Sequence, residues 1–173
     1  MSAGRKLLLA AMTTAGCLLV GLAGHDRFTP RLLFNTTASA PVGFYVLSPG
    51  PPVVGEWVAI RPPADLARWM ALRGYLPVNV PLLKQVAAVP GQQACGRDGV
   101  LLIDDVPAVR MRSKDRWGRA LKPFIGCRRL AVGEVLLVNR HAPDSLDGRY
   151  FGPLPSRGIV GKARPLWTWD ARP

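Results

Sequence analysis

The sequence predicts a mostly β protein with a folded-sheet or barrel-like core and one short helix, preceded by one N-terminal transmembrane helix. Three observations predict this class. Glycine (18) and proline (17) are scattered between short apolar runs, which is typical of many short strands joined by turns. In the rest of the chain only residues 64–73 show helical spacing, whereas residues 7–24 form an uncharged run long enough to cross a bilayer. The 173 residues suffice for one domain, and 49% hydrophobic residues exclude a disordered chain.

The predicted membrane anchor is the run from Leu7 to Gly24, about 18 residues without a charge. Arg5 and Lys6 precede it, so the positive-inside rule keeps residues 1–6 in the cytoplasm and exports residues 25–173. We therefore predict a single-pass protein of the inner (cytoplasmic) membrane with a periplasmic domain. A cleaved signal peptide is the alternative, because small residues end the run, although without an A-x-A motif.

Turn signals divide the exported part into short segments. In chain order we expect an extended segment over residues 31–37, a turn at Pro41 and Gly43, a strand ending at Ile60, a helix over residues 64–73, a strand over residues 80–90, two strands over residues 100–112, and a basic, turn-rich segment over residues 113–123. The segment VGEWVAI at Val54 has a near copy, VGEVLLV, at Val132. The two copies predict two similar strand starts in one sheet system.

Three cysteines lie in this chain, and their surroundings differ. Cys17 lies in the apolar run and is expected to be a small buried residue. Cys95 and Cys127 lie in the exported part, where thiols are expected to oxidise to a disulfide, with two free buried thiols as the alternative. One cysteine pair and two distant histidines give no zinc-ligand spacing, so we expect neither a metal nor another cofactor.

Lys84 is the only formal charge between Arg73 and Arg97, and apolar residues surround it. Such surroundings desolvate an ammonium group and lower its pKa, and a neutral lysine amine can act as a general base. The usual partner of a lysine base is a serine nucleophile. The alternative is a lysine that extends from an edge strand into water.

Ser39 is the candidate nucleophile, because it lies in a predicted extended segment shortly after the anchor. Alternate residues of a strand share a face, so we expect the Thr37 hydroxyl beside the Ser39 hydroxyl. With the Ser39 backbone N–H, the Thr37 hydroxyl would stabilise the oxyanion of a tetrahedral intermediate. The alternative is a polar stretch between a strand and a turn.

A third polar segment, SLDGRYFGP, begins at Ser145. If it is extended, Ser145, Asp147 and Arg149 share one face, on which the aspartate and the arginine pair and the serine hydrogen-bonds a nearby amine. The alternative is a surface loop with an ion pair.

Taken together, these segments resemble the signal peptidase family of serine–lysine membrane proteases. The family's order is an anchor, a nucleophile segment, a strand, a lysine segment and a final polar segment, and here these are the apolar run, TASAPVGFY, VGEWV, LKQVAAVPG and SLDGRYFGP. Ala40 follows the serine where the housekeeping members carry methionine, and Gln85 stands where the family usually has a basic residue. The pattern N-x-T-x-S-x-P-x-G-x-Y, the cysteine pair and the segment DRWGR resemble the TraF branch of conjugative-transfer peptidases.

This resemblance implies a signal-peptidase-like fold and a catalytic site. Its residues would be Ser39 as nucleophile, Lys84 as general base, Thr37 as oxyanion donor, Ser145 to orient the lysine, and Asp147 with Arg149 to hold the wall of the site. The implied reaction is acyl transfer from an exported, pilin-like precursor with small residues before the cleavage site. The implied role is pilin maturation for conjugative transfer, with or without cyclisation of the pilin.

Other function classes fit the sequence less well. A Ser/His/Asp hydrolase needs a histidine near a carboxylate, but His25 lies at the predicted membrane boundary and His141 shares one short loop with Asp144. A non-catalytic, membrane-anchored envelope or secretion assembly protein gives no reason for an isolated Lys84. The net charge of +12 is dispersed along an exported chain, which favours anionic membrane lipids rather than nucleic acid as a partner.

Overall fold

The computed structural model describes residues 3–23 and 32–169. The chain divides into two compact units, Met1–Pro30 and Arg31–Pro173. The first holds helix α1 (Ala3–Ala23). Across residues 3–23 and 32–169, no helix combines the length and the apolar character of a membrane span. The anchor over residues 7–24 ends at a glycine outside the described residues and stays a prediction.

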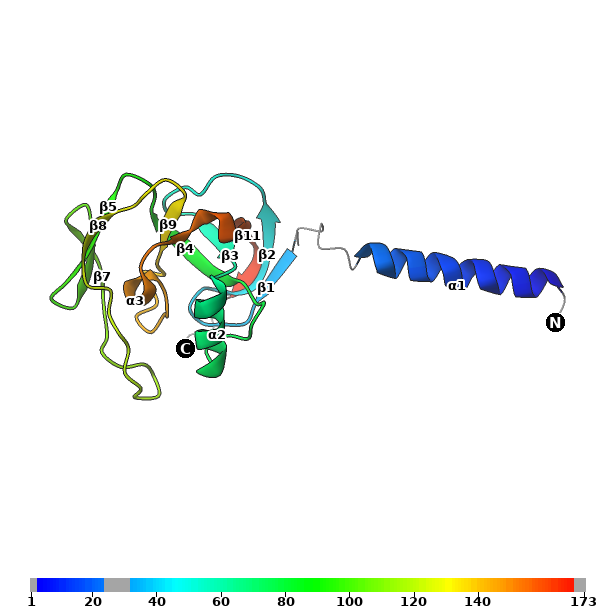
Figure 1. Cartoon of the computed structure of the whole chain (residues 1–173), viewed down its shortest axis with the longest axis horizontal. Helices are drawn as coiled ribbons and strands as arrows, with labels where there is room; N and C mark the ends of the chain where they lie inside the picture. The colour runs from blue at the N-terminus through cyan, green and yellow to red at the C-terminus, as the bar shows by residue number, and fades with distance from the viewer. Residues whose placement is uncertain (1–2, 24–31, 170–173) are drawn as a thin grey trace. The chain divides into compact units, whose positions relative to one another are not determined.

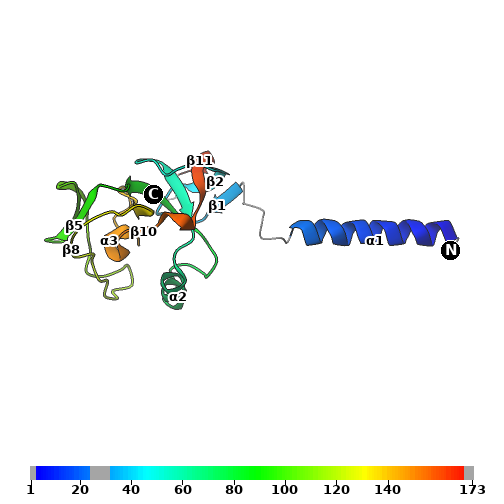
Figure 2. The ribbon, with the colours of Figure 1, turned by 45° about the horizontal axis from the view of Figure 1, so that its top comes forward.

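The second unit contains two antiparallel sheets, so the mostly β prediction is confirmed (Figures 1 and 2). The larger sheet has the strand order β1-β2-β11-β3-β4-β9-β10, and the smaller has the order β7-β6-β5-β8. The strands are β1 (Leu32–Asn35), β2 (Val42–Ser48), β3 (Trp57–Ile60), β4 (Leu82–Ala88), β5 (Gln93–Arg97), β6 (Val100–Ile103), β7 (Val106–Arg110), β8 (Gly126–Arg129), β9 (Glu134–Leu137), β10 (Leu154–Pro155) and β11 (Ile159–Trp169). The helices of this unit are α2 (Ala64–Leu72), α3 (Gly148–Phe151) and the 3₁₀ helix η1 (Ser156–Gly158).

Strand β4 lies at the centre of this arrangement, between β3 and β9. These two neighbours are the strands predicted from the repeated VGE segment, and they do belong to one sheet. In both views the smaller sheet lies at the opposite end of the unit from β1 and β2 (Figures 1 and 2). The turn-signalled strand pair around Asp104 and Asp105 is also confirmed, because β6 and β7 pair across it.

The core also centres on β4, which contributes to three separate clusters of buried side chains. Leu82 and Val86 pack with Met70 of α2, Leu83 packs with Tyr45 of β2, and the two alanines that end the strand pack toward the smaller sheet. A strand packed on both faces is held rigidly, because its side chains have no room to move. A buried side chain on β4 is therefore held in place by its neighbours.

Two local predictions were wrong. The turn expected at Pro41 and Gly43 falls earlier, over residues 37–40, and Gly43 lies inside β2 with a φ of 138°. Glycine is required at that position, because a Cβ there would lie 2.2 Å from the Trp167 carbonyl oxygen of β11. The segment from Ser145 to Arg149 is not extended either, since Asp147 caps the short helix α3.

Candidate active site

The buried polar residues of the chain gather in one place. Within residues 32–169 the polar or charged residues that are buried as a whole are Asn35, Lys84, Asn139, Ser145, Asp147 and Arg149. All of them take part in hydrogen bonds around the start of β4 and the turn between β1 and β2. Because each buried polar group costs stability unless it is hydrogen-bonded, such a concentration indicates a functional site.

Lys84 lies on the face of β4 that it shares with Leu82 and Val86, and only 3% of its surface is exposed. Its Nζ donates a hydrogen bond of 2.7 Å to Ser145 Oγ. Burial lowers the pKa of Lys84 from 10.5 to about 8, with a smaller opposing effect from Asp147 and a smaller lowering effect from Arg149. A lysine in this state is within reach of the neutral amine form near physiological pH.

Ser39 lies in the turn between β1 and β2 and is half-buried. Its hydroxyl is 3.3 Å from the Thr37 hydroxyl, a distance at which either oxygen can donate. The two hydroxyls are therefore neighbours as predicted, but through a turn rather than through strand alternation. Thr37 also donates from its hydroxyl to Asn35 Oδ1, at 2.9 Å.

Asn35 holds this turn together, a role that our sequence reasoning missed. Its Nδ2 donates to the carbonyl oxygens of Thr37, Ala40 and Pro41, at 2.9, 3.2 and 3.0 Å. Its Oδ1 accepts from the backbone N–H of Thr37 at 3.1 Å. Asparagine commonly forms such bonds two residues ahead in turns, so the NTT spacing was an available signal.

Asp147 and Arg149 form a buried ion pair, with exposures of 0% and 1%. Arg149 donates from Nε to Asp147 Oδ1 at 2.8 Å and from Nη2 to Oδ2 at 3.1 Å. Asp147 is the N-cap of the short helix α3, and Arg149 lies in its first turn. Gly148 between them lets this helix approach β9 closely. A Cβ on Gly148 would lie 2.8 Å from the Leu137 carbonyl oxygen.

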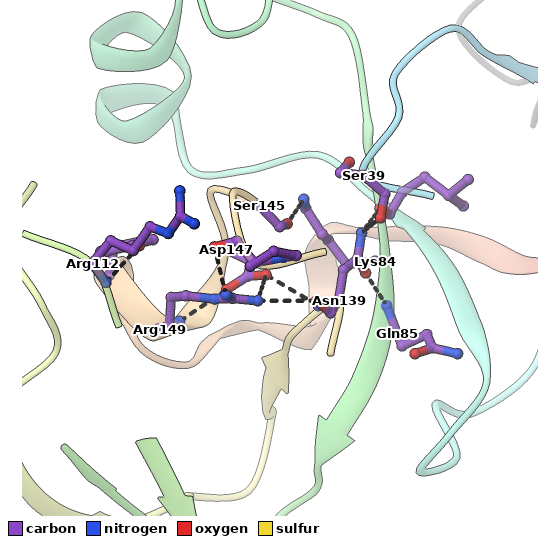
Figure 3. A network of polar contacts seen from close by, with 11 residues as sticks. Ser39, Lys84, Gln85, Arg112, Asn139, Ser145, Asp147 and Arg149 are labelled. Carbon is purple, nitrogen blue, oxygen red and sulfur yellow. Dashed lines mark hydrogen bonds and ion pairs between the residues drawn. The ribbon is translucent and has the colours of Figure 1, made fainter. Parts of the chain in front are cut away.

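Asn139 is the second residue that sequence reasoning missed. It follows β9, and its side chain contacts both the serine turn and β4 (Figure 3). Nothing about an isolated asparagine after an apolar strand indicates these contacts, because they join segments about 55 and 100 residues apart.

A cleft of about 440 Å³ brings four of the predicted residues together. Thr37, Ser39, Lys84 and Ser145 all line it. Figure 3 shows Lys84 lying between Ser145 and Ser39. Asp147 and Arg149 do not line the cleft themselves, but Arg149 Nη1 donates to the carbonyl oxygen of the lining residue Pro143 at 3.1 Å.

An aromatic cluster forms another side of the same cleft, to which Tyr75, Asp115 and Trp117 contribute. Asp115 accepts hydrogen bonds from the Tyr75 hydroxyl at 2.5 Å and from Arg119 Nε at 2.7 Å. The Arg119 guanidinium lies over the rings of Tyr75 and Trp117, at 4.8 and 4.4 Å from their centroids. This cluster gives the DRWGR segment a structural role beside the cleft.

The predicted disulfide is present and joins β5 to β8. Cys95 and Cys127 are directly opposed in the register of these strands, with a Cα–Cα distance of 4.0 Å. The bond ties two strands of the smaller sheet together, and neither cysteine lines the cleft.

Comparison with known proteins gives the family. The chain belongs to the signal peptidase family, peptidase S26, which matches residues 9–169. The conjugal transfer protein TraF of Agrobacterium fabrum is 34% identical over 179 residues, covering 96% of each chain. A probable conjugal transfer protein TraF of Sinorhizobium fredii is 35% identical over 182 residues, covering 96% of this chain and 92% of its own. The family assigned from the sequence motifs is thus confirmed.

Among solved structures, a signal peptidase I from Enterococcus faecalis V583 superposes with a TM-score of 0.41 and 17% sequence identity. The superposition covers 66% of this chain and 98% of that chain.

Proposed function

We propose that this chain is a membrane-anchored serine endopeptidase in which Ser39 is the nucleophile and Lys84 is the general base. The observation that carries the proposal is a buried lysine with a pKa of about 8 that lines the same cleft as a half-buried serine. Membership of a peptidase family supports it. A non-catalytic assembly protein would have no use for a desolvated lysine, whose burial costs stability.

In the proposed reaction, neutral Lys84 takes the proton from Ser39 Oγ as that oxygen attacks the peptide carbonyl carbon. The resulting oxyanion is stabilised by the Ser39 backbone N–H and the Thr37 hydroxyl, which turns from Asn35 toward the substrate. The Lys84 ammonium then gives its proton to the leaving amine, and the peptide bond breaks. Lys84 finally takes a proton from the water or incoming amine that attacks the acyl carbon, and gives that proton to Ser39 Oγ as the ester bond breaks.

Ser145 supports this cycle by accepting a hydrogen bond from Lys84 Nζ at 2.7 Å. The contact fixes the direction of the lysine side chain at the bottom of the cleft. Because a hydroxyl is neutral, it orients the amine without adding a negative charge that would hold the proton on Lys84.

The proposed substrates are exported, pilin-like precursors with small residues before the cleavage site, processed for conjugal transfer. Relatives that are named as conjugal transfer proteins, and that match nearly the whole chain, support this role. The proposed location is the inner membrane, with residues 25–173 in the periplasm. Its support is the uncharged run of residues 7–24 after Arg5 and Lys6.

The decisive experiment incubates the purified full chain in detergent micelles with pilin-like precursors and follows cleavage by mass spectrometry. Ser39→Ala and Lys84→Ala should each abolish cleavage. Lys84→Arg should also be inactive, because a guanidinium stays protonated and cannot accept the serine proton. Wild-type activity should rise with pH through about 8, as Lys84 loses its proton.

Ser48→Ala and Lys162→Arg are the matched controls, because Ser48 ends β2 in solvent and neither residue lines the cleft. Both variants should cleave the precursor at the wild-type rate. Full activity in Lys84→Arg would exclude the lysine base. Full activity in Ser39→Ala would exclude Ser39 as the nucleophile, and absence of cleavage by the wild type would favour the non-catalytic assembly protein.

A further inference from the structure

Asn139 connects the two halves of the proposed dyad through a single carboxamide, and it is only 2% exposed. Its Nδ2 donates to the Ser39 carbonyl oxygen at 2.7 Å and to the Leu83 carbonyl oxygen at 3.3 Å. Its Oδ1 accepts from the backbone N–H of Gln85 at 3.0 Å. The side chain thus binds the backbone of the nucleophile and the peptide groups on both sides of Lys84.

These contacts occur where the β4–β9 ladder ends. The paired residues are Val86 with Leu137 and Ala88 with Leu136, and one further backbone bond joins Val138 N–H to the Gln85 carbonyl at 2.9 Å. Beyond that point the Asn139 side chain takes the place of backbone, because a carboxamide carries the same donor and acceptor as a peptide group. The edge of β4 at Lys84 is therefore completed by one side chain.

The backbone of Asn139 is itself fixed from behind by the buried ion pair. Its N–H donates to Asp147 Oδ2 at 3.0 Å, and its carbonyl oxygen accepts from Arg149 Nη2 at 3.0 Å. Figure 3 shows these bonds in one network. The ion pair thus fixes the backbone of Asn139, whose side chain in turn binds the Ser39 carbonyl oxygen and the backbone of β4.

Within residues 32–169, the Lys84 side chain has its hydrogen bond to Ser145, and the Ser39 hydroxyl has its contact with Thr37. No hydrogen bond joins the Ser39 and Lys84 side chains to each other in these described residues, so their relative position depends on how their backbones are held. Asn139 is the side chain that holds both.

We propose that Asn139 is a positioning residue that sets the distance and direction from Ser39 to Lys84, with the Asp147–Arg149 pair as its support. The inference rests on the proposed function, because it concerns the geometry of that dyad. Misplacing a reacting group by about 1 Å can cost on the order of 10² in rate, so the expected effect is large although Asn139 touches no substrate.

The test compares Asn139→Ala and Asn139→Asp with the wild type, using full chain in detergent micelles. The substrate is the peptide that wild-type protein cleaves fastest from a library of capped decapeptides with small central residues. In Asn139→Ala, kcat should fall on the order of 10²-fold, with little change in KM. The pH midpoint of kcat should stay near that of the wild type, because Lys84 keeps its burial and its bond to Ser145.

Asn139→Asp keeps the size of the side chain and the acceptor for Gln85 N–H, but places an oxygen against the Ser39 carbonyl. It should lose at least as much kcat, and it serves as the test if the alanine variant does not fold. Gln92→Ala is the matched control, because Gln92 is also a bridging amide, bonded to Val89 N–H and Asp104. That variant should lose stability while keeping kcat.

The outcomes separate this inference from the proposed function. If wild-type protein cleaves, Ser39→Ala does not, and folded Asn139→Ala or Asn139→Asp keeps wild-type kcat, only the positioning role is overturned. A shifted pH midpoint in Asn139→Ala would show that Asn139 acts on the ionisation of Lys84 instead, and would overturn it too. Cleavage by Ser39→Ala would overturn the proposed function itself.

Discussion

Replacing Lys84 with methionine should make the protein inactive and should reveal how much stability the lysine costs. Methionine has a similar length, is apolar, and fits the buried position between Leu82 and Val86. At about 1.4 kcal/mol for each tenfold change in proton affinity, a pKa lowered from 10.5 to about 8 corresponds to about 3 kcal/mol. Losing the hydrogen bond to Ser145 offsets part of the gain, because that hydroxyl is left without its partner.

The pH dependence of the free energy of unfolding reports on Lys84 alone, because the Ser145 hydroxyl does not titrate between about pH 8 and 10.5. The loss of the hydrogen bond to Ser145 therefore does not affect it. Below about pH 8 Lys84 is protonated in both the folded and the unfolded chain, so the folded protein bears the whole cost. Between about pH 8 and 10.5 the folded protein releases a proton that the unfolded chain retains, so wild-type stability rises with pH. Relative to Lys84→Met, the wild type should gain about 3 kcal/mol across that interval.

The measurement is urea unfolding of the full chain in detergent micelles, followed by circular dichroism from pH 7 to 10.5. The control is Leu83→Met on the same strand, whose difference from the wild type should not change with pH because neither side chain titrates. A constant difference between wild type and Lys84→Met across the interval would refute a lowered pKa for Lys84. The case for a lysine base near neutral pH would then lose its physical basis.

Two further predictions concern the disulfide and the topology. Changing both Cys95 and Cys127 to serine should lower the free energy of unfolding by about 3–4 kcal/mol, because the disulfide closes a loop with a sequence separation of 32. An unchanged urea midpoint in the double variant would contradict this prediction. Protease added to spheroplasts should digest residues 25–173, because Arg5 and Lys6 hold the N-terminus inside. Protection of that region would place the cleft on the wrong side for exported precursors.

Composition and short-range patterns predicted much of the fold. The helix at residues 64–73, the hairpin around Asp104 and the repeated VGE strands were readable because apolar periodicity and turn residues act locally. The long strand β11 was not predicted, although it pairs with both β2 and β3. Its second half is largely exposed and contains a proline, so its sequence lacks the alternation that marks a half-buried strand.

Four of the residues proposed from the sequence line one cleft, but the local geometry of the candidate site was not predicted. Lys84 was recognisable because a single charge in an apolar run is a local signal. Ser145 and Asp147 were expected on an extended face, whereas the structure bends this segment into a capped helix that Gly148 allows to lie against β9. Asn139 was missed because its partners are distant in sequence, and no local pattern encodes a side chain that completes a sheet edge.

The buried polar residues of the site differ in their effect on stability: most of them stabilise the domain, whereas one destabilises it. Asn35, Asn139, Asp147 and Arg149 satisfy one another or the backbone, so removing any of them leaves a buried partner unpaired. Lys84 has one neutral partner, and its burial opposes the charged form. The burial of Lys84 is unfavourable, whereas the other buried polar groups of the network are hydrogen-bonded. Such an arrangement is expected where the protein needs a neutral amine, and a lysine that acts as a base needs one.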